Sequence, residues 1–418
     1  MGERVKHTGK ALATFFVVLM ILRIFSYFMI SENPTITRIF KTGLRVALTG
    51  ISFLILMRIN SYKHPTRFAY YNLLAFGFYV MYLFVGFASL LWTTELGWSA
   101  LQLGMASECV FFVWFYWQAF LTFNDQPQFT HKIKFSYILW VAITWTCIYF
   151  LIGAVVDPDM YFRGTHGGEV QRLGGWIINP NELGMLCGVG AASLYVNIME
   201  ESKVSLWMVL AWIIILVSLL LTQSRSSLIG FAITTLYFVM ISGKIKLILP
   251  TLVGGAFAAP VVFFSIFVKE GDVGEVMSMT GRLPFWHDLL VYGFQERPMT
   301  GYGFMRIWHY QKFPSIHGFP GSMTHNTFLQ ILLNLGITGA MMGFLNMIFT
   351  FRACARERNP LIRHAFIGMF VPVFINSLTE FGIFGDANYG IMWWLFLIMF
   401  FVVRVQPPHI QYRPLYAS

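Results

Sequence analysis

Three residues of this 418-residue chain combine a reactive side chain with an informative position: Arg225, Arg282 and His325. Arg225 lies in Thr-Gln-Ser-Arg-Ser-Ser, a hairpin tip between two apolar blocks. A guanidinium suits a phosphate or pyrophosphate, because its planar fork of N–H donors matches the anion's oxygens. An arginine that snorkels from a helix end to a membrane surface has the same sequence pattern. The residues around Arg225 leave both interpretations open.

Arg282 begins a segment in which large apolar residues recur at helical spacing: Leu283, Trp286, Leu290 and Phe294. This pattern predicts an amphipathic helix that lies on a membrane surface. Arg282 is then at the N-terminal end of the helix, where an anion is favoured. A structural lid is the alternative interpretation of the same segment.

His325 directly precedes an apolar block and has Asn326 beside it. The dipole of a helix N-terminus disfavours a charged imidazole, and a neutral imidazole accepts a proton from an attacking hydroxyl. We therefore predict that His325 is a neutral general base, with Asn326 as a possible site residue. A polar cap at the membrane interface is the alternative.

Two acidic residues lie inside apolar blocks, where an ionisable side chain is functional by default. Glu380 is near one end of its block and is a possible site residue, whereas Glu108 suits packing against a polar partner. A metal is not expected. Asp157-Pro-Asp159 has the Asp-x-Asp pattern of some metal sites, but a match of three residues is common by chance. The spacing of the histidines in 269–325 fits no ordinary zinc site.

The elements that position these residues follow from the composition, which is 57% hydrophobic and only 11% charged. A soluble domain carries roughly 25% charged residues. The apolar content excludes disorder, and four scattered cysteines exclude a disulfide scaffold. The net charge of +10 is dispersed between apolar blocks, which argues against nucleic-acid binding. We predict an all-α polytopic integral membrane protein, with residues 1–418 forming a single membrane domain.

About 20 apolar residues cross a membrane as a helix, and about twelve blocks have this character. They are 11–30, 42–59, 69–92, 100–121, 135–156, 182–199, 205–222, 226–242, 246–268, 326–351, 364–384 and 389–405. Lys and Arg favour alternate loops, which predicts that both termini are cytoplasmic and that the first block is an uncleaved span. Two longer loops, 157–181 and 269–325, then lie on the outer side. Long ordered loops are usually functional, and the second carries the amphipathic helix.

Several segments on the predicted outer side share their order with one known family. They are Arg172-Leu-Gly-Gly-Trp-Ile-Ile-Asn-Pro-Asn-Glu-Leu-Gly184, Ser224-Arg225-Ser-Ser-Leu228, Gly281-Arg282-x-x-x-Trp286 with Pro298-x-x-Gly-Tyr-Gly303, His325-Asn326-x-x-Leu329 with Leu335-Gly336 and Gly339, and Ser377-Leu-Thr-Glu380. Together they resemble the bacterial O-antigen ligase and exopolysaccharide polymerase superfamily. The similarity extends from about residue 160 to residue 385.

The resemblance implies a membrane-embedded class-C type glycosyltransferase of the bacterial inner membrane. Such enzymes take a glycan from undecaprenyl pyrophosphate on the periplasmic face, without a metal, a cofactor or a nucleotide sugar. The acceptor is a sugar hydroxyl of lipid A–core in ligases, or of a second lipid-linked glycan in polymerases. By position, His325 matches the family's proposed base. Arg225 and Arg282 match arginines associated with the donor pyrophosphate, Arg172 matches more loosely, and Arg306 is a further possible site residue.

A ligase is the first expectation, but the motifs do not exclude a polymerase. Arg163 precedes Gly174, and Arg282 precedes Gly293, with ten residues between them in both cases. This is similar to some O-antigen polymerases, which have an Arg-x10-Gly pattern in each of two outer loops. A flippase or transporter would show an internal repeat and interrupted helices meeting at the bilayer midplane, and no convincing repeat is present. A purely structural scaffold would not need His325 beside outward arginines.

Overall fold

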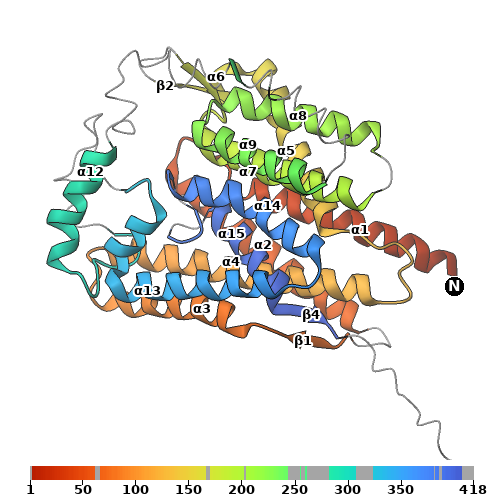
Figure 1. The fold of residues 1–418 in the computed structure, drawn as a ribbon, viewed down its shortest axis with the longest axis horizontal. Helices are drawn as coiled ribbons and strands as arrows, with labels where there is room; N and C mark the ends of the chain where they lie inside the picture. Colours follow the sequence, from red (N-terminus) through yellow and green to blue (C-terminus); the bar gives the residue numbers. More distant parts are fainter. Residues whose placement is uncertain are drawn as a thin grey trace, which may run out of the picture.

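The computed structural model describes residues 2–61, 66–165, 170–201, 204–242, 255, 259–260, 282–306, 323–380, 382–385 and 388–406. In this part of the chain the fold is a bundle of helices with two small antiparallel β-ribbons (Figure 1). The long helices are α1 (Gly2–Phe25), α2 (Pro34–Asn60), α3 (Leu73–Ala88), α4 (Leu96–Asp125), α5 (Phe135–Val156), α7 (Pro180–Glu200), α8 (Leu206–Thr222), α9 (Arg225–Ser242), α13 (Thr327–Arg356), α14 (Pro360–Ser377) and α15 (Tyr389–Val402).

Seven of the described helices are long and apolar enough to cross a membrane, namely α2, α3 with its 3-10 extension η1 (Ser89–Leu91), α4, α5, α7, α13 and α14. Three shorter apolar helices are α8, α9 and α15. The prediction of an all-α polytopic membrane protein is confirmed. Each predicted block overlaps a described helix except 246–268, which lies almost entirely outside the described residues. A total of twelve spans therefore stays a prediction.

Two predicted spans are too long at the end of the bundle that holds the N-terminus. The block 69–92 begins with the strand β1 (Phe68–Tyr70), and the block 389–405 ends with β4 (Val403–Val405). The strands pair antiparallel, with Phe68 opposite Val405. A short apolar run fits a strand as well as a helix end, because both bury the same side chains.

A third correction concerns Glu380, which was predicted inside the block 364–384. Helix α14 ends at Ser377, and the chain folds back on itself. The Ser377 hydroxyl accepts a hydrogen bond from the amide of Ile383. A Cβ at Gly382 would lie 1.6 Å from the Ser377 oxygen, so only glycine permits this close approach. Glu380 consequently lies in the turn that follows the helix.

The loop 157–181 contains structure that the apolar pattern did not predict. A short helix, α6 (Pro158–Tyr161), leads into the ribbon of β2 (Phe162–Thr165) and β3 (Val170–Leu173), where Arg163 is opposite Arg172. Gly175 then adopts a φ of 57°, and a Cβ there would lie 2.0 Å from the carbonyl oxygen of Met160. The turn lays the ribbon across the start of α7.

A helix is present at the start of the predicted amphipathic segment. Helix α12 (Arg282–Asp288) continues as a π-turn, η3 (Leu289–Gly293), and a 3-10 turn, η4 (Phe294–Glu296). Leu289 is buried and packs with Leu333 of α13, whereas Leu283 is exposed. Contact of this helix with a membrane surface stays a prediction.

Helix α13 is interrupted at Gly336, whose φ of 62° and ψ of −161° are not helical. The freed carbonyls of Leu333 and Asn334 accept hydrogen bonds from the amides of Tyr302 and Gly303, at 3.0 and 2.9 Å. This pairing explains two of the sequence motifs, because each contains the glycine that the close approach requires.

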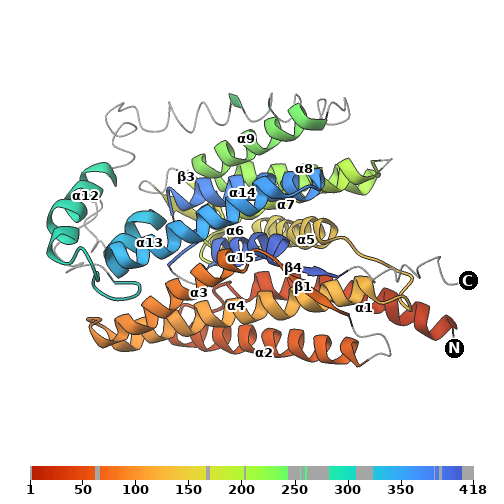
Figure 2. The same cartoon turned by 60° about the horizontal axis from the view of Figure 1, so that its bottom comes forward.

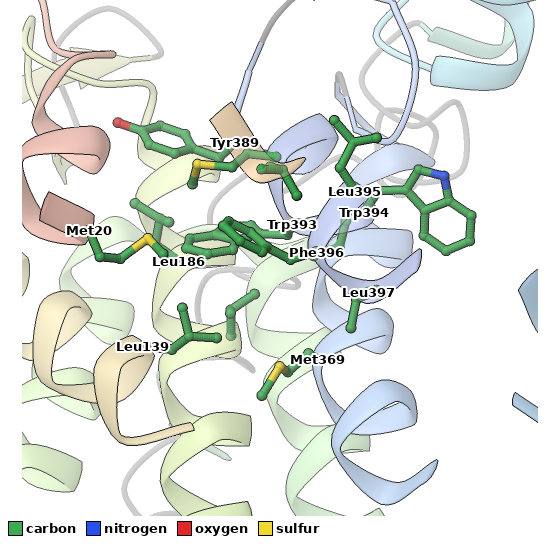
Figure 3. Close-up of a cluster of buried hydrophobic side chains, with 14 of the residues drawn as sticks. Met20, Leu139, Leu186, Met369, Tyr389, Trp393, Trp394, Leu395, Phe396 and Leu397 are labelled. Carbon is green, nitrogen blue, oxygen red and sulfur yellow. The ribbon is translucent and has the colours of Figure 1, made fainter. Parts of the chain in front are cut away.

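The core of the bundle surrounds α15, in which every residue is buried. Figure 3 shows its Trp393 and Phe396 on the side of Met20 of α1, Leu139 of α5 and Leu186 of α7. Trp394 points to the other side, where its ring lies near those of Phe366 and Phe370 of α14. Helix α15 is thus enclosed by protein rather than by lipid.

An ionic triad ties together α1, α2 and α4. The Arg23 guanidinium binds both carboxylate oxygens of Glu108, at 2.7 and 2.9 Å, and Arg45 Nε lies 3.3 Å from the same group. All three side chains are buried. This pairing explains why two arginines and a glutamate interrupt apolar blocks.

Candidate active site

The ends of several helices that are distant in sequence meet at one end of the bundle. They are the start of α7, the turn between α8 and α9, the start of α13 and the turn after α14. Figures 1 and 2 show α12 at this end, with the N-terminus at the opposite end. Polar side chains from each of these segments form one hydrogen-bonded network.

The Glu380 carboxylate is the centre of this network. Its Oε2 lies 3.0 Å from His325 Nδ1, and its Oε1 accepts bonds from Asn181 Nδ2 at 2.7 Å and Arg282 Nη2 at 3.2 Å. Burial alone would raise the pKa of Glu380. The hydrogen bond and charge of His325, with Arg282 and Asn181, instead hold it below its ordinary value. Glu380 is therefore an ionised hydrogen-bond acceptor at neutral pH.

His325 lies just before helix α13, as predicted, in a left-handed conformation with φ of 51°. Because an ionised carboxylate can only accept, the Glu380 contact places a proton on Nδ1. A neutral ring then has its lone pair on Nε2. The His325 side chain is 42% exposed, whereas that of Glu380 is only 6% exposed. The imidazole thus connects a buried anion to the open side of the network.

Asn326 is the cap of α13 rather than a free polar group. Its Oδ1 accepts bonds from the amides of Phe328 and Leu329, and its Nδ2 donates to the Leu378 carbonyl at 3.2 Å. The residue therefore joins the start of α13 to the turn that carries Glu380. The bond from Asn326 to the Leu378 carbonyl thus helps to position this turn.

Helix α12 contacts the network through two residues one turn apart. Arg282 Nη1 donates to the Thr379 carbonyl at 2.8 Å, and Trp286 Nε1 donates to the Thr324 carbonyl at 2.6 Å. Residues at this spacing share a helix face. The motif Gly-Arg-x-x-x-Trp therefore attaches α12 on both sides of the His325–Glu380 pair.

Arg172 enters the network from strand β3. Its Nη2 lies 2.6 Å from Asn181 Oδ1, and its Nε donates to the Thr222 carbonyl at 3.0 Å. Burial lowers the pKa of Arg172 to about 10; the charge of Glu380 opposes this shift, and the positive charges of three other arginines add to it. These are Arg163, Arg225 and Arg282. The arginines predicted for anion binding therefore lie close enough to repel one another.

Arg225 is the first residue of α9 and is half-buried. The first turn of α9 is fixed to α7, because Ser227 Oγ donates to the Asn181 carbonyl at 3.2 Å. Gly184 permits this contact, since a Cβ there would lie 2.6 Å from the Ser227 side chain. The serine-rich turn thus positions Arg225 beside the residue that bridges Arg172 and Glu380.

Other candidates lie elsewhere. Arg306 pairs with Glu95 at 3.1 Å and lies over the Trp98 ring at the start of α4. Asp157 accepts from the Met160 amide and caps α6. The histidines at positions 309 and 317 lie outside the described residues.

Asn181 is the residue that sequence reasoning missed. It bridges Arg172 and Glu380 with its two amide atoms, although 199 residues separate it from Glu380. One signal was available in Asn179-Pro-Asn181. Asn179 is the N-cap of α7, so Asn181 is not needed as a cap.

The network can bind an anion and supply a base. Arg172 and Arg282 each use two of the five N–H donors of a guanidinium in the bonds above. Within the described residues, these bonds leave the other donors of both guanidiniums for a ligand. Four arginines and one carboxylate give an excess of positive charge, which suits a multiply charged anion near His325.

The comparison with protein families gives an independent result. A family described as O-antigen ligase matches residues 210–344, a range that includes Arg225, Arg282 and His325 and ends before Glu380. The search of curated proteins found no match. Members of the matched family are glycosyltransferase-like membrane enzymes, which agrees with the apolar helices of this chain. Over residues 210–344, and in the order of its motifs, the chain is similar to the O-antigen ligase and polymerase superfamily.

Proposed function

We propose that the protein transfers a glycan from undecaprenyl pyrophosphate to a sugar hydroxyl of lipid A–core, as an O-antigen ligase. The observation that carries this proposal is the Glu380 carboxylate. It joins His325 directly to Arg282 and, through Asn181, to Arg172. A base and an anion site therefore share one rigid support, as transfer from a pyrophosphate to an alcohol requires.

The arginines bind the donor pyrophosphate. Negative charge grows on the pyrophosphate as its bond to the sugar breaks, and fixed positive charge at that place is usually the largest catalytic term. Arg225 and Arg282 contact the pyrophosphate, and Arg172 supports them from the ribbon. The leaving group departs as an anion, so it needs no general acid.

His325 acts as the base. The acceptor hydroxyl oxygen forms a bond to the anomeric carbon while the carbon–oxygen bond to pyrophosphate breaks, and the hydroxyl proton passes to Nε2. Glu380 holds the Nδ1 proton and stabilises the imidazolium that forms. The reaction written in this way uses no metal and no cofactor.

The same proposal places the protein in the bacterial inner membrane. Both termini lie in the cytoplasm, and the loops 157–181 and 269–325 lie in the periplasm with the active site. The positive charges of alternate loops support this orientation. The lipid donor explains why the site is at the membrane surface, at the ends of the helices.

A polymerase that uses a second lipid-linked glycan as acceptor is the alternative. Arg163, which begins one Arg-x10-Gly pattern, favours the polymerase. It lies opposite Arg172 in the ribbon, and its positive charge helps to lower the pKa of Arg172. Deletion of the gene, followed by analysis of lipid-linked intermediates, tests both. Loss of a ligase leaves long chains on undecaprenyl pyrophosphate and bare lipid A–core, whereas loss of a polymerase leaves single repeats. Unchanged surface glycan and intermediates would contradict both.

A further inference from the structure

A second basic site lies at the opposite end of α13, away from His325. A cavity of about 230 Å³ opens between the start of α3 and the end of α13. It is lined by Asn72, Leu74, Ala75, Phe349, Arg352 and Arg356. A cavity of this size has room for several water molecules, and therefore for a phosphate headgroup.

The charge of the cavity comes from Arg352 and Arg356, which lie one turn apart on α13. Both side chains are exposed, and neither forms an ion pair with a carboxylate within the described residues. Two guanidiniums that line one cavity suit a phosphate group, which accepts several charge-assisted hydrogen bonds. The cavity therefore has the charge that complements an anion.

Apart from Asn72, the remaining wall of the cavity is apolar and continues onto the outside of the bundle. Leu74 is 58% exposed, and the neighbouring Leu73 and Ile348 are also exposed. On a helix that crosses a membrane, such side chains contact acyl chains. An occupant that fits both parts of this surface carries a phosphate and hydrocarbon chains in the same molecule.

The two walls are held firmly in place. Asn346 Nδ2 donates to the Ala75 carbonyl at 2.6 Å, and the Phe78 and Phe349 rings stack with centroids 5.2 Å apart. Figure 2 shows α3 and α13 side by side. The cavity is consequently a feature of the packed bundle.

We propose that this cavity binds the headgroup of an anionic phospholipid, with Arg352 and Arg356 on its phosphate and its acyl chains along α3 and α13. The site is separate from the candidate active site and does not depend on the proposed function. Basic cavities between membrane helices recognise anionic headgroups by this chemistry.

The test measures binding of phosphatidylglycerol to the purified full-length protein by native mass spectrometry and by its increase of the melting temperature. Each arginine near a lipid surface contributes on the order of 1 kcal/mol, so the double variant Arg352→Gln/Arg356→Gln should bind about 30-fold more weakly. The double Lys variant should retain most binding. Arg358→Gln is the matched control, because Arg358 is an exposed neighbour that does not line the cavity.

Three outcomes would overturn the proposal. Wild-type affinity in the double Gln variant would show that the arginines do not hold the headgroup. Equal stabilisation by phosphatidylcholine would remove the requirement for an anionic headgroup. A similar effect of inorganic phosphate alone would identify a soluble anion site instead. Melting of the double Gln variant at the wild-type temperature without added lipid verifies that it is folded.

Discussion

His325 Nδ1 and Glu380 Oε2 lie 3.0 Å apart, although 55 residues separate them in the chain. The pair joins the start of α13 to the turn after α14. In this geometry the carboxylate determines which ring nitrogen carries the proton, so in a neutral ring the other nitrogen can accept one. A histidine whose tautomer is fixed in this way needs no metal to define its role.

The first prediction concerns His325 itself. Positioned proton transfer contributes about 10²–10⁴-fold to a rate, so His325→Ala should lose turnover by this factor and retain donor binding. Turnover with a purified lipid-linked glycan and equilibrium binding of the same donor are the two measurements. His287→Ala is the control, because His287 is exposed on α12 and contacts only Asp288. A rate within a few-fold of wild type would remove His325 from the mechanism.

The second prediction concerns the shape of the arginine. Arg225→Lys or Arg282→Lys keeps the charge but loses the planar pair of donors. Each lost charge-assisted bond costs about 1.5–3 kcal/mol, which corresponds to a rate reduction of roughly 10- to 150-fold. Arg297→Lys is the matched control, because Arg297 lies over the Tyr302 ring outside the network. Full activity in both site variants would refute a pyrophosphate contact.

The third prediction concerns pH. Since its folded-state pKa is lowered, Glu380 stabilises the protein fully above its unfolded value of about 4.3, and this contribution is lost as the pH falls through the lowered value. Thermal unfolding measured from pH 7 downwards should show this loss in the wild type and a smaller one in Glu380→Gln. Glu95→Gln should behave as the wild type. Identical acid dependence in wild type and Glu380→Gln would contradict the assignment.

The fourth prediction concerns Asn181. Replacement by Ala removes the donor to Glu380 and the acceptor for Arg172, and an unsatisfied buried polar group costs about 1–3 kcal/mol. Asn181→Ala should therefore lower both the melting temperature and the turnover. Asn359→Ala removes the cap at the start of α14, whereas Glu380 follows the end of this helix. This control should lower the melting temperature but not the turnover. Normal turnover in Asn181→Ala would make the bridge structural only.

The fifth prediction concerns the triad in α1, α2 and α4. Glu108→Gln leaves two buried guanidiniums without their carboxylate, and breaking a buried pair in this way costs about 3–5 kcal/mol. The melting temperature of the purified protein should fall sharply. Adding Arg23→Met should recover part of the loss, since fewer charges then remain unpaired. A double variant less stable than Glu108→Gln would count against this account.

The sequence predicts the helices well, because a long apolar run in lipid has few alternatives to a helix. The strand pair of Phe68–Tyr70 and Val403–Val405 was not predicted, since its partners are more than 300 residues apart and each is only three residues long. The π-turn at Leu289–Gly293 was not predicted either, because simple helical periodicity does not contain that insertion.

The candidate site shows the same division. The types and positions of Arg225, Arg282 and His325 were sufficient to single them out. The central position of Glu380 was not, because it depends on where α14 ends and on the fold-back at Gly382. The role of Asn181 could not be predicted for a related reason. Its side chain bridges Arg172 and Glu380, which only the folded chain brings together.

The enclosure of α15 has a consequence for biosynthesis. This helix follows the other described helices in the chain, yet all of its residues are buried among them. The ribosome therefore releases the central helix after the helices that surround it, and the bundle closes only when α15 enters. The hydroxyl of Tyr389 then donates to the Ile24 carbonyl at 2.8 Å, joining the last described helix to the first. A nascent chain that stops before α15 leaves the centre of the bundle unfilled, so quality-control proteases should recognise prematurely terminated copies.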